Sequence, residues 1–520
     1  MLNMFQRIFK LFSILFISVC FFPFTSFGQL SLTGQVRTRS EIRDGYGTFN
    51  LKGAPSAFLT SQRTRLSFGY KWERINFNAS VQDVRVWGQD ASSISNADGN
   101  RLMLHEGWAD IILLNSKDSS NHTKWLENLT FKIGRQVINY DDGRLIGELD
   151  WAQQARRHDA AVLKALHKGW QVDIGAGFNQ NNDGVGISGT KYIPGNVPQN
   201  VTNSMGELVV SPSGMIPLAP AGSASSKSSK SGTPVLMNPP STNGMNQEYK
   251  AMQFVYVSRS MGKMKLSGLF FKDDFSKYRL DSVGTVSTGF VYGRRYDQTG
   301  VNSRITYGAL LSGTCDKILK ALWTAGVYFQ NGTDKEGVKL SAANYTASIM
   351  FQSGKFTFGP GFDYLSGDKS STAPTASHRF DPLYNTPHKF WGYLDYFYVA
   401  TGSPIGGLQN AFFKTKFTGT RFSLACDIHH FALAETVLNK KLPNQPAIKN
   451  NLGNELDIVA SYTLNKFTLL EAGYSFMAAT NSLEYIKKET VGLYNQNPQW
   501  AYLSINIRPD FLFGKSSEKK

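Results

Sequence analysis

Alternation of apolar and polar residues is the feature that most constrains the fold of this chain. In residues 63–72, Leu66, Phe68, Tyr70 and Trp72 occupy the even positions, while Arg, Ser, Gly and Lys occupy the odd ones. The same alternation recurs at 170–179, 421–430, 454–463 and 499–508. Because successive side chains of a β-strand point to opposite faces, this pattern predicts strands with one apolar and one polar face.

Two further features favour a membrane barrel over a soluble sandwich. The polar face is often Gly, Ser, Asn or a charged residue, as expected for a water-filled interior, and aromatic residues gather near strand ends. Strands cross lipid only as a closed barrel, because an open edge leaves backbone groups unpaired. We therefore predict an all-β fold, a transmembrane antiparallel β-barrel of roughly 16 to 18 strands with long extracellular loops in the bacterial outer membrane.

The N-terminus predicts export. Arg7 and Lys10 precede an apolar run over 11–24, and a stretch of small and polar residues ends at Gly28. This is typical of a secretory signal peptide over 1–28, followed by a barrel over 29–520. A retained membrane anchor is disfavoured because the apolar run is short for a span. A lipoprotein signal at Cys20 is disfavoured because Val19 is bulky for that site.

Residues 181–247 are rich in Gly, Ser, Pro and Asn and have almost no apolar period. We predict a long loop within the barrel, either extracellular or folded over the pore, and not a domain boundary, because the strand pattern resumes at 253. Residues 366–388 form a second long connection. At 75–85 the lipid-facing positions reach Asp83 and Arg85, so either the strand has left the lipid there or a bulge flips its register.

Basic residues are the motif with the clearest functional meaning. The formal net charge is +16, and basic residues recur on the polar faces of predicted strands. They cannot all face lipid, where a charge at mid-depth costs about 2–4 kcal/mol, so we predict that they line the lumen. Rings of Arg and Lys select anions, and Arg matches carboxylates bidentately. These residues are Arg37, Arg39, Arg63, Arg65, Lys132, Lys414, Lys416 and Arg421. The alternatives are a solvated face on loops and contact with lipopolysaccharide at the rim.

Motifs for other chemistry are weak. The sequence GVGISG at 184–189 opens no predicted helix, and NQNNDG at 179–184 lacks the acidic twelfth residue of a calcium loop. His429 and His430 are adjacent on a strand and therefore point to opposite faces. We predict no enzyme activity, no cofactor, no metal and no nucleic-acid partner. After cleavage only Cys315 and Cys426 remain, which do not make a disulfide framework.

Several stretches together resemble the alginate export family of outer-membrane barrels. They are GRQVINYDDGRLIGELDWAQQARRHDA at 134–160, VQDVRVWG at 81–88, and residues 378–399 and 454–476. The resemblance implies a monomeric barrel of 18 antiparallel strands with a basic constriction that passes a polyanionic uronate polymer. It also implies pore roles for Arg135, Arg144, Arg156 and Arg157, with Asp142, Glu148 and Asp150 as acidic partners. The other interpretation is that these charged pairs only rigidify the barrel wall.

The sequence thus predicts a passive outer-membrane channel, anion-selective through a basic constriction, for export or diffusion of acidic polysaccharide or oligosaccharide such as alginate-like uronates. A general anion-selective porin and a plugged structural or adhesive barrel are the alternatives. The expected partners are outer-membrane lipid and lipopolysaccharide, anionic polysaccharide or small anions, and periplasmic export components.

Overall fold

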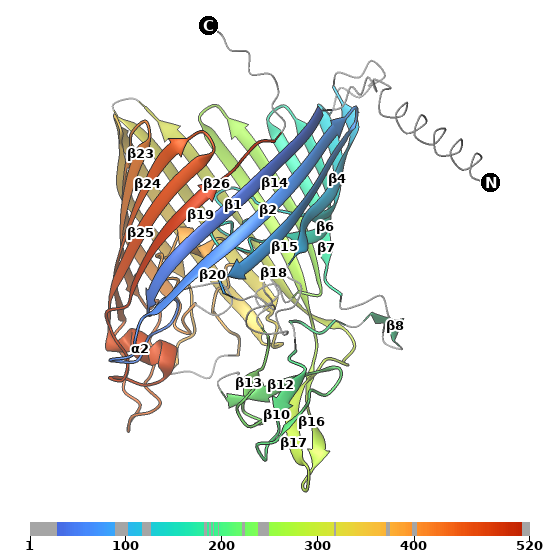
Figure 1. Ribbon diagram of the computed structural model, residues 1–520, viewed down its shortest axis with the longest axis vertical. Coiled ribbons are helices and arrows are strands. Elements are labelled where there is room, and N and C mark those ends of the chain that lie inside the picture. The colour runs from blue at the N-terminus through green and yellow to red at the C-terminus, as the bar shows by residue number, and fades with distance from the viewer. Residues whose placement is uncertain are drawn as a thin grey trace, which may run out of the picture.

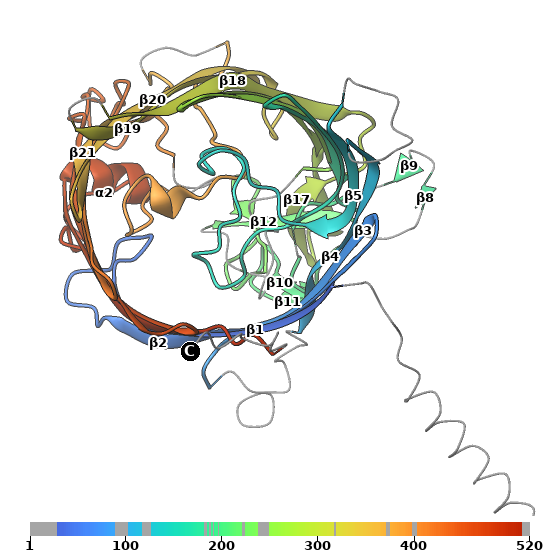
Figure 2. The ribbon, with the colours of Figure 1, turned by 90° about the horizontal axis from the view of Figure 1, so that it is seen from above.

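Eighteen antiparallel strands close into one barrel in the computed structural model (Figures 1 and 2). The structure describes residues 29–88, 102–116, 126–180, 185–186, 189–190, 192–195, 197–220, 224–237, 249–316, 319–370, 375–397 and 403–511. The predicted signal peptide, 1–28, lies outside these residues. The barrel strands are β1 (Gln29–Asp44), β2 (Ala57–Trp72), β3 (Ile75–Val86), β4 (Met103–Asn115), β5 (Asn128–Gln136), β6 (His158–His167), β7 (Trp170–Phe178), β14 (Ala251–Met261), β15 (Met264–Ser276), β18 (Val301–Cys315), β19 (Lys320–Thr333), β20 (Lys339–Ser353), β21 (Phe356–Leu365), β22 (Leu408–Thr418), β23 (Phe422–Ala432), β24 (Asn451–Asn465), β25 (Thr468–Ala479) and β26 (Gln499–Ile507).

Closure is made by the first and last strands. β1 pairs with β26 from Val36↔Ile507 to Asp44↔Gln499, and β1 also pairs with β2 along nearly its whole length. No barrel edge is therefore left open to lipid. This confirms the predicted fold class and the strand number that the family resemblance implied.

The predicted alternation sets which side chains face lipid. In β2, Arg63 is fully buried inside the barrel, whereas Leu66 and Phe68 are 46% and 40% exposed on the outer face. In β1, Arg37 and Arg39 are buried while Val36 and Ile42 are exposed. Apolar side chains thus face outward and polar ones face the lumen, as the period of two predicts.

The two ends of the barrel differ. Short turns, the start of β1 and the end of β26 lie at one end, and the long connections lie at the other (Figure 1). In bacterial barrels the short turns are periplasmic and the long loops extracellular. The long-loop end also carries the helix α2 (Asn481–Lys488). Among the described residues, no helix is long and apolar enough to cross a membrane.

The connection 181–247 is more ordered than predicted. Its described parts hold the short strands β8 (Val185–Gly186), β9 (Gly189–Thr190), β10 (Asn200–Thr202), β11 (Leu208–Val210), β12 (Met215–Ala219) and β13 (Thr233–Pro234). β12 pairs with β17 (Gly289–Arg295), which pairs with β16 (Arg279–Thr285), so two separate connections build one four-stranded sheet outside the barrel (Figure 1). Runs of two to five residues are too short to show a period of two in the sequence.

Two other connections fold into the lumen, which the sequence did not predict. The loop 137–157, between β5 and β6, runs inside the ring of strands (Figure 2). The loop 366–407, between β21 and β22, also enters the lumen with its described residues 380–397. Their apolar residues, among them Ile146, Tyr384 and Leu394, pack with inward side chains such as Phe254 and Phe431 into the main hydrophobic core. The core of this barrel is therefore partly inside its own lumen.

The register of β3 supports the first of the two interpretations of Asp83 and Arg85. The β2–β3 pairing runs without a shift from Trp72↔Ile75 to Ser61↔Val86, so both residues keep their outward position. They form an ion pair of 2.6 Å near the long-loop end of β3, where the strand leaves the lipid.

Candidate functional site: a basic wall and two lumenal loops

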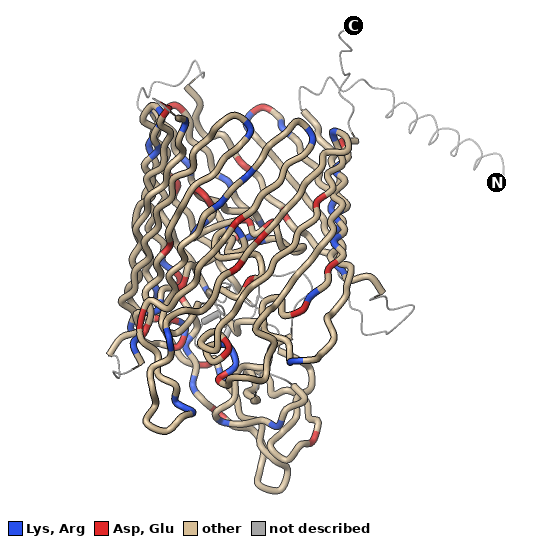
Figure 3. Tube along the Cα trace, turned by 90° about the vertical axis from the view of Figure 1, so that its left-hand side faces the viewer, with Lys and Arg blue, Asp and Glu red and all other residues tan. Residues whose placement is uncertain are grey.

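Five arginines line one part of the barrel interior. Arg37, Arg39 and Arg43 come from β1, and Arg63 and Arg65 come from β2, with Arg37 directly opposite Arg63 in the register. Arg157, at the end of the loop 137–157, adds to the electrostatic field at Arg65. We call these six arginines the basic wall. Figure 3 shows charges of both signs along the strands.

Arg37 and Arg63 fasten the loop 137–157 to the strands. The Arg37 guanidinium donates to the side chain of Gln153 at 3.0 Å and to the backbone oxygens of Asp150, Trp151 and Ala152. Both arginines also form ion pairs with the Asp150 carboxylate, at 3.4 Å from Arg37 and 2.8 Å from Arg63. Charge-assisted hydrogen bonds of this kind are roughly twice as strong as neutral ones, so the loop is held firmly against the wall.

Glu41 is the second acidic group at the basic wall. It accepts from Arg39 at 2.9 Å and pairs with Arg43 at 2.7 Å, while the Trp500 indole donates to it at 3.0 Å. The Arg39 guanidinium also lies 4.3 Å from the centroid of the Trp151 ring. Glu106 is the third acid, since it contributes to the field at Arg65. Six arginines thus stand against Glu41, Asp150 and Glu106, a local excess of positive charge.

The pKa of Asp150 reflects its surroundings. Burial alone would raise the pKa of this carboxyl, but the guanidiniums of Arg63, Arg37 and Arg65 outweigh burial and hold it below its usual range. Asp150 is therefore ionised at neutral pH and acts as the anchor between the loop and the strands.

Arg65 is the member of the basic wall that is best placed to meet a solute. Its guanidinium donates to the neutral Gln82 side chain at 2.6 Å and 3.0 Å, and it is only half-buried. Unlike Arg37 and Arg63, it holds no part of the lumenal loops among the described contacts. Among the residues that the structure describes, no carboxylate contacts the Arg65 guanidinium directly.

The two lumenal loops bind each other. The Gly147 N–H donates to the Tyr384 oxygen at 2.9 Å, and the Tyr384 N–H donates to the Leu145 oxygen at 2.8 Å. The ring of Trp151 stacks on His388 with centroids 4.0 Å apart and planes 8° apart. The loops therefore form one packed body across the lumen.

Arg144 and Arg156 lie inside this body. Arg144 is buried and pairs with Asp363 at 2.8 Å and with Asp142 at 3.1 Å, over the ring of Phe390. Arg156 is almost fully buried and donates to the Asn385 backbone oxygen. These residues hold the loops together, and the interpretation that the charged pairs rigidify the barrel applies to them.

Gly392 allows the loop 366–407 to approach the barrel strand β24 closely. Gly392 has φ of +79°, and a Cβ at this position would lie 2.5 Å from the Glu455 carboxylate. The same carboxylate accepts from the Leu394 N–H at 2.8 Å. Any larger residue would be strained and would push this loop away from β24.

The remaining predicted residues divide into three groups. Lys132 and Lys414 face inward: the Lys132 ammonium lies 3.8 Å from the Trp108 ring centroid, and Lys414 pairs with Asp427 at 2.7 Å. Lys416 has the same parity as Lys414 but is exposed, and Arg421 is exposed in the turn before β23. Arg157 is buried, with its guanidinium 3.1 Å from the Met103 sulfur, and Glu148 is exposed.

Arg135 is the prediction that the structure contradicts. It shares the parity of Ile133, which is 47% exposed on the outer face, and it pairs with Asp159 at 2.8 Å across the β5–β6 ladder. Arg135 therefore lies on the outside of the barrel near its extracellular rim and not in the lumen. Its position agrees with its parity, which it shares with Phe131 and Ile133, and differs from the pore role that the family resemblance implied.

The sequence missed several inward acidic and basic groups. Arg304 pairs with Asp273 at 2.5 Å, and the Tyr384 hydroxyl donates to the same carboxylate at 2.7 Å, so this cluster secures the loop 366–407. Lys164 and Asp173 face the lumen from β6 and β7. Strand parity alone could have found Asp173 and Lys164, because each alternates with apolar neighbours.

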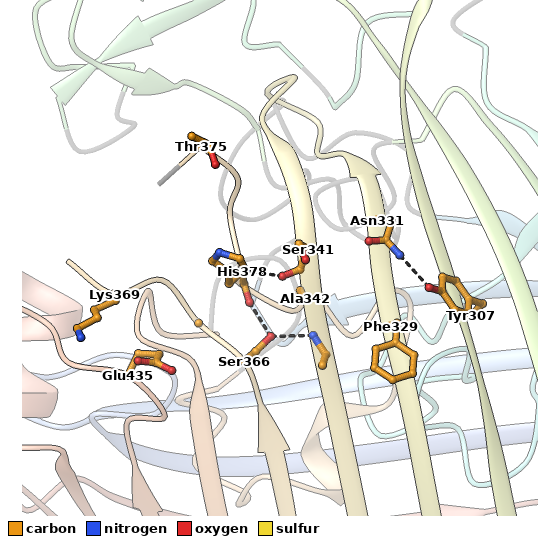
Figure 4. Close-up of a pocket in the computed structure, with 12 residues that line it drawn as sticks. Tyr307, Phe329, Asn331, Ser341, Ala342, Ser366, Lys369, Thr375, His378 and Glu435 are labelled. Atoms are coloured by element: carbon orange, nitrogen blue, oxygen red, sulfur yellow. Dashed lines mark hydrogen bonds between the residues drawn. The ribbon is translucent and has the colours of Figure 1, made fainter. Parts of the chain in front are cut away.

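A cavity lies on the outer side of the barrel strands (Figure 4). It measures about 800 Å³ and is lined by the outward Tyr307 and Phe329 and by residues of the extracellular connections, including His378 and Ser366. Ser366 donates to the His378 oxygen at 2.6 Å and accepts from the Ala343 N–H at 2.8 Å. Because Tyr307 and Phe329 face away from the lumen, this cavity is not part of a path through the barrel. No group of three or more metal-ligating side chains occurs in the described part of the chain.

These features define a class: an outer-membrane β-barrel with the architecture of a channel, located in the bacterial outer membrane. The model of the alginate export family matches residues 28–176, a range that contains the basic wall and the loop 137–157. The resemblance to this family is thereby confirmed for that part of the chain.

Solved structures of similar fold are outer-membrane proteins of two bacteria. Acinetobacter baumannii OccAB4 is 10% identical with a TM-score of 0.53, and the match covers 93% of this chain and 98% of that chain. Pseudomonas aeruginosa OccK2 (OpdF) is 10% identical with a TM-score of 0.52 and the same two coverages. P. aeruginosa OpdQ is 12% identical with a TM-score of 0.50, again over 93% and 98%. At these identities the likeness concerns the fold alone. No curated protein matches the sequence.

Proposed function

We propose that the protein is a passive, anion-selective channel that carries acidic oligosaccharide or polysaccharide, such as alginate-like uronates, across the outer membrane. The observation that carries this proposal is the basic wall, where six arginines stand against three carboxylates on the inner face of β1 and β2 and at the adjoining loop. The match of this region to the alginate export family supports a uronate as the solute.

The physical basis is electrostatic. A surplus of one sign, enclosed by a low-dielectric wall, raises the local concentration of the opposite ion and lowers its barrier to passage. The guanidinium of Arg65 offers a planar pair of donors that suits a carboxylate. Arg37 and Arg63 also add positive charge to the lumen, while their guanidinium groups stay bonded to the loop 137–157.

Flow in this proposal is diffusive, and a long polymer would require periplasmic export components to deliver it. A monomer and the absence of enzyme activity stay predictions. The general anion-selective porin remains the second candidate, because nothing in the basic wall distinguishes a uronate chain from another carboxylate.

The plugged barrel is the third candidate, and a specific observation favours it. The loops 137–157 and 366–407 pack into the main hydrophobic core within the lumen. If this body fills the cross-section, the barrel carries no current and serves a structural or adhesive role through its extracellular sheet.

Single-channel conductance in a planar bilayer separates the three candidates. We expect anion-selective current from the refolded protein and interruptions of that current when an oligouronate is added, but not when a neutral oligosaccharide of equal length is added. Anion current that the oligouronate does not interrupt would favour the general anion-selective porin. A silent barrel that conducts after deletion within 366–407 would overturn the channel and establish the plug.

A further inference from the structure

A second cavity lies in the lumen among strands other than β1 and β2, which carry most of the basic wall. It has a volume of about 450 Å³ and lies among inward side chains of β4 to β7, β14 and β15, beneath the start of the loop 137–157. Three lysines and three aspartates line it: Lys132, Lys164, Lys265, Asp110, Asp141 and Asp173. Its charges therefore cancel, in contrast to the surplus at the basic wall.

One acid–base pair in this cavity, Asp141 with Lys265, already has its hydrogen-bond partners. The Asp141 carboxylate accepts from Lys265 at 2.9 Å, from the Tyr256 hydroxyl at 2.7 Å and from Ser267 at 2.7 Å. Tyr256 in turn stacks on Tyr140 with centroids 4.2 Å apart. This side of the cavity is rigid and has little capacity left for a ligand.

The two other aspartates are incompletely bonded. Asp173 is 4% exposed, and its Oδ2 accepts from Tyr140 at 2.8 Å and from Gln171 at 3.0 Å, but its Oδ1 is buried without a hydrogen bond. The Oδ1 of Asp110 is likewise buried and unbonded. A buried acceptor without a donor costs about 1–3 kcal/mol, so a ligand with a donor group would be stabilised here.

The two other lysines are also incompletely paired. Lys164 stands opposite Asp173 and Lys132 stands opposite Asp110 in the register. Within the described part of the chain, neither ammonium lies within ion-pair distance of a carboxylate, and Lys132 instead lies over Trp108. The cavity thus offers two acceptor oxygens and two ammonium groups at neighbouring positions.

We propose that this cavity binds a small zwitterion, a solute with one ammonium and one carboxylate, such as a free amino acid. The ammonium of the solute would donate to Asp173 and Asp110, and its carboxylate would accept from Lys164 and Lys132. A singly charged solute would satisfy one set of groups and meet like charge from the other, and a polyanion would meet three carboxylates. This site is independent of the anion selectivity of the basic wall.

Three probes of one carbon skeleton test this proposal. L-Glutamine is the zwitterion, 4-carbamoylbutanoate lacks its ammonium, and 4-aminobutanamide lacks its carboxylate. Saturation-transfer difference NMR on residues 29–520 in detergent micelles measures binding without any need for current. A failed channel proposal therefore leaves the result readable. We expect glutamine to bind at least about tenfold more tightly than either analogue, the usual effect of one charged hydrogen bond.

Matched variants locate the site. Lys164→Gln should weaken glutamine binding about tenfold, and Asp173→Asn should do the same, whereas Lys168→Gln in the exposed turn of the same hairpin should leave it unchanged. Lys164 is half-buried, so Lys164→Gln serves as the test if Asp173→Asn fails to fold. Equal binding of the three probes, or glutamine binding that neither variant weakens, would overturn the proposal.

Discussion

At the scale of single residues, the inner face of this barrel uses the same side chains for charge and for architecture. Arg37 and Arg63 contribute positive charge to the basic wall and also hold the loop 137–157 through Asp150. Arg65 contributes charge with only a neutral amide in contact. A substitution at Arg63 would therefore mix two effects, whereas one at Arg65 leaves the Asp150 anchor in place.

Asp150→Asn should release the loop 137–157 from the strands. It leaves the buried Arg63 without its carboxylate, which costs about 3 kcal/mol and should lower amide protection in 149–156 roughly a hundredfold. Hydrogen exchange at neutral pH measures this protection. The control is Asp159→Asn, which removes a carboxylate from the outer face and should leave the loop protected. Equal protection in the wild type and Asp150→Asn would contradict the anchor role.

The same anchor predicts a dependence on pH. Because the pKa of Asp150 is lower in the folded protein than in an unfolded chain, its stabilising effect is complete above the ordinary value of about 3.9 and is lost as the pH falls through the folded value. Protection of 149–156, corrected for the intrinsic exchange rate, should therefore be constant from pH 7 to about pH 4 and fall below it. The Asp150→Asn variant should show no such step.

At the scale of elements, the two lumenal loops behave as one body. Trp151 stacks on His388, lies under Arg39 and meets Trp500 edge to face with centroids 5.5 Å apart. One side chain from the first loop thus contacts the second loop and two barrel strands. We expect the loops to order and to loosen together.

Trp151→Ala should show this coupling. Trp151 is partly buried, so its loss should cost up to about 3–5 kcal/mol and should reduce amide protection in 383–391 of the second loop as well as in the first. The matched control is Trp170→Ala, since Trp170 is exposed on the outer face. Loss of protection confined to 149–156 would show that the loops are independent.

The strands could be predicted from sequence and the lumenal loops could not. A period of two extends over ten or more residues in strands such as β2, so parity placed Arg63, Arg65 and Lys132 inside correctly. The loops carry no such period, and their partners, such as Tyr384 for Gly147, are far away in the chain. For Arg135 the sequence analysis followed the family resemblance, although its shared parity with Ile133 indicates the outer face that the structure shows.

At the scale of the whole molecule, charge is distributed unevenly around the lumen. The basic wall has a surplus of arginine, whereas the 450 Å³ cavity is lined by equal numbers of lysines and aspartates. A path along β1 and β2 would therefore favour anions, whereas the 450 Å³ cavity would favour neither sign. Selectivity should follow the sign of the wall and not the net charge of the protein.

The reversal potential of single channels in a salt gradient tests this account most directly, with Arg65→Glu compared against Arg135→Glu. Both variants change the net charge of the chain by the same amount, but Arg65 faces the lumen and Arg135 faces outward. We predict that the wild type and Arg135→Glu share one anion-selective reversal potential and that Arg65→Glu shifts it toward zero or beyond. Equal reversal potentials for Arg65→Glu and Arg135→Glu would contradict selection by the basic wall.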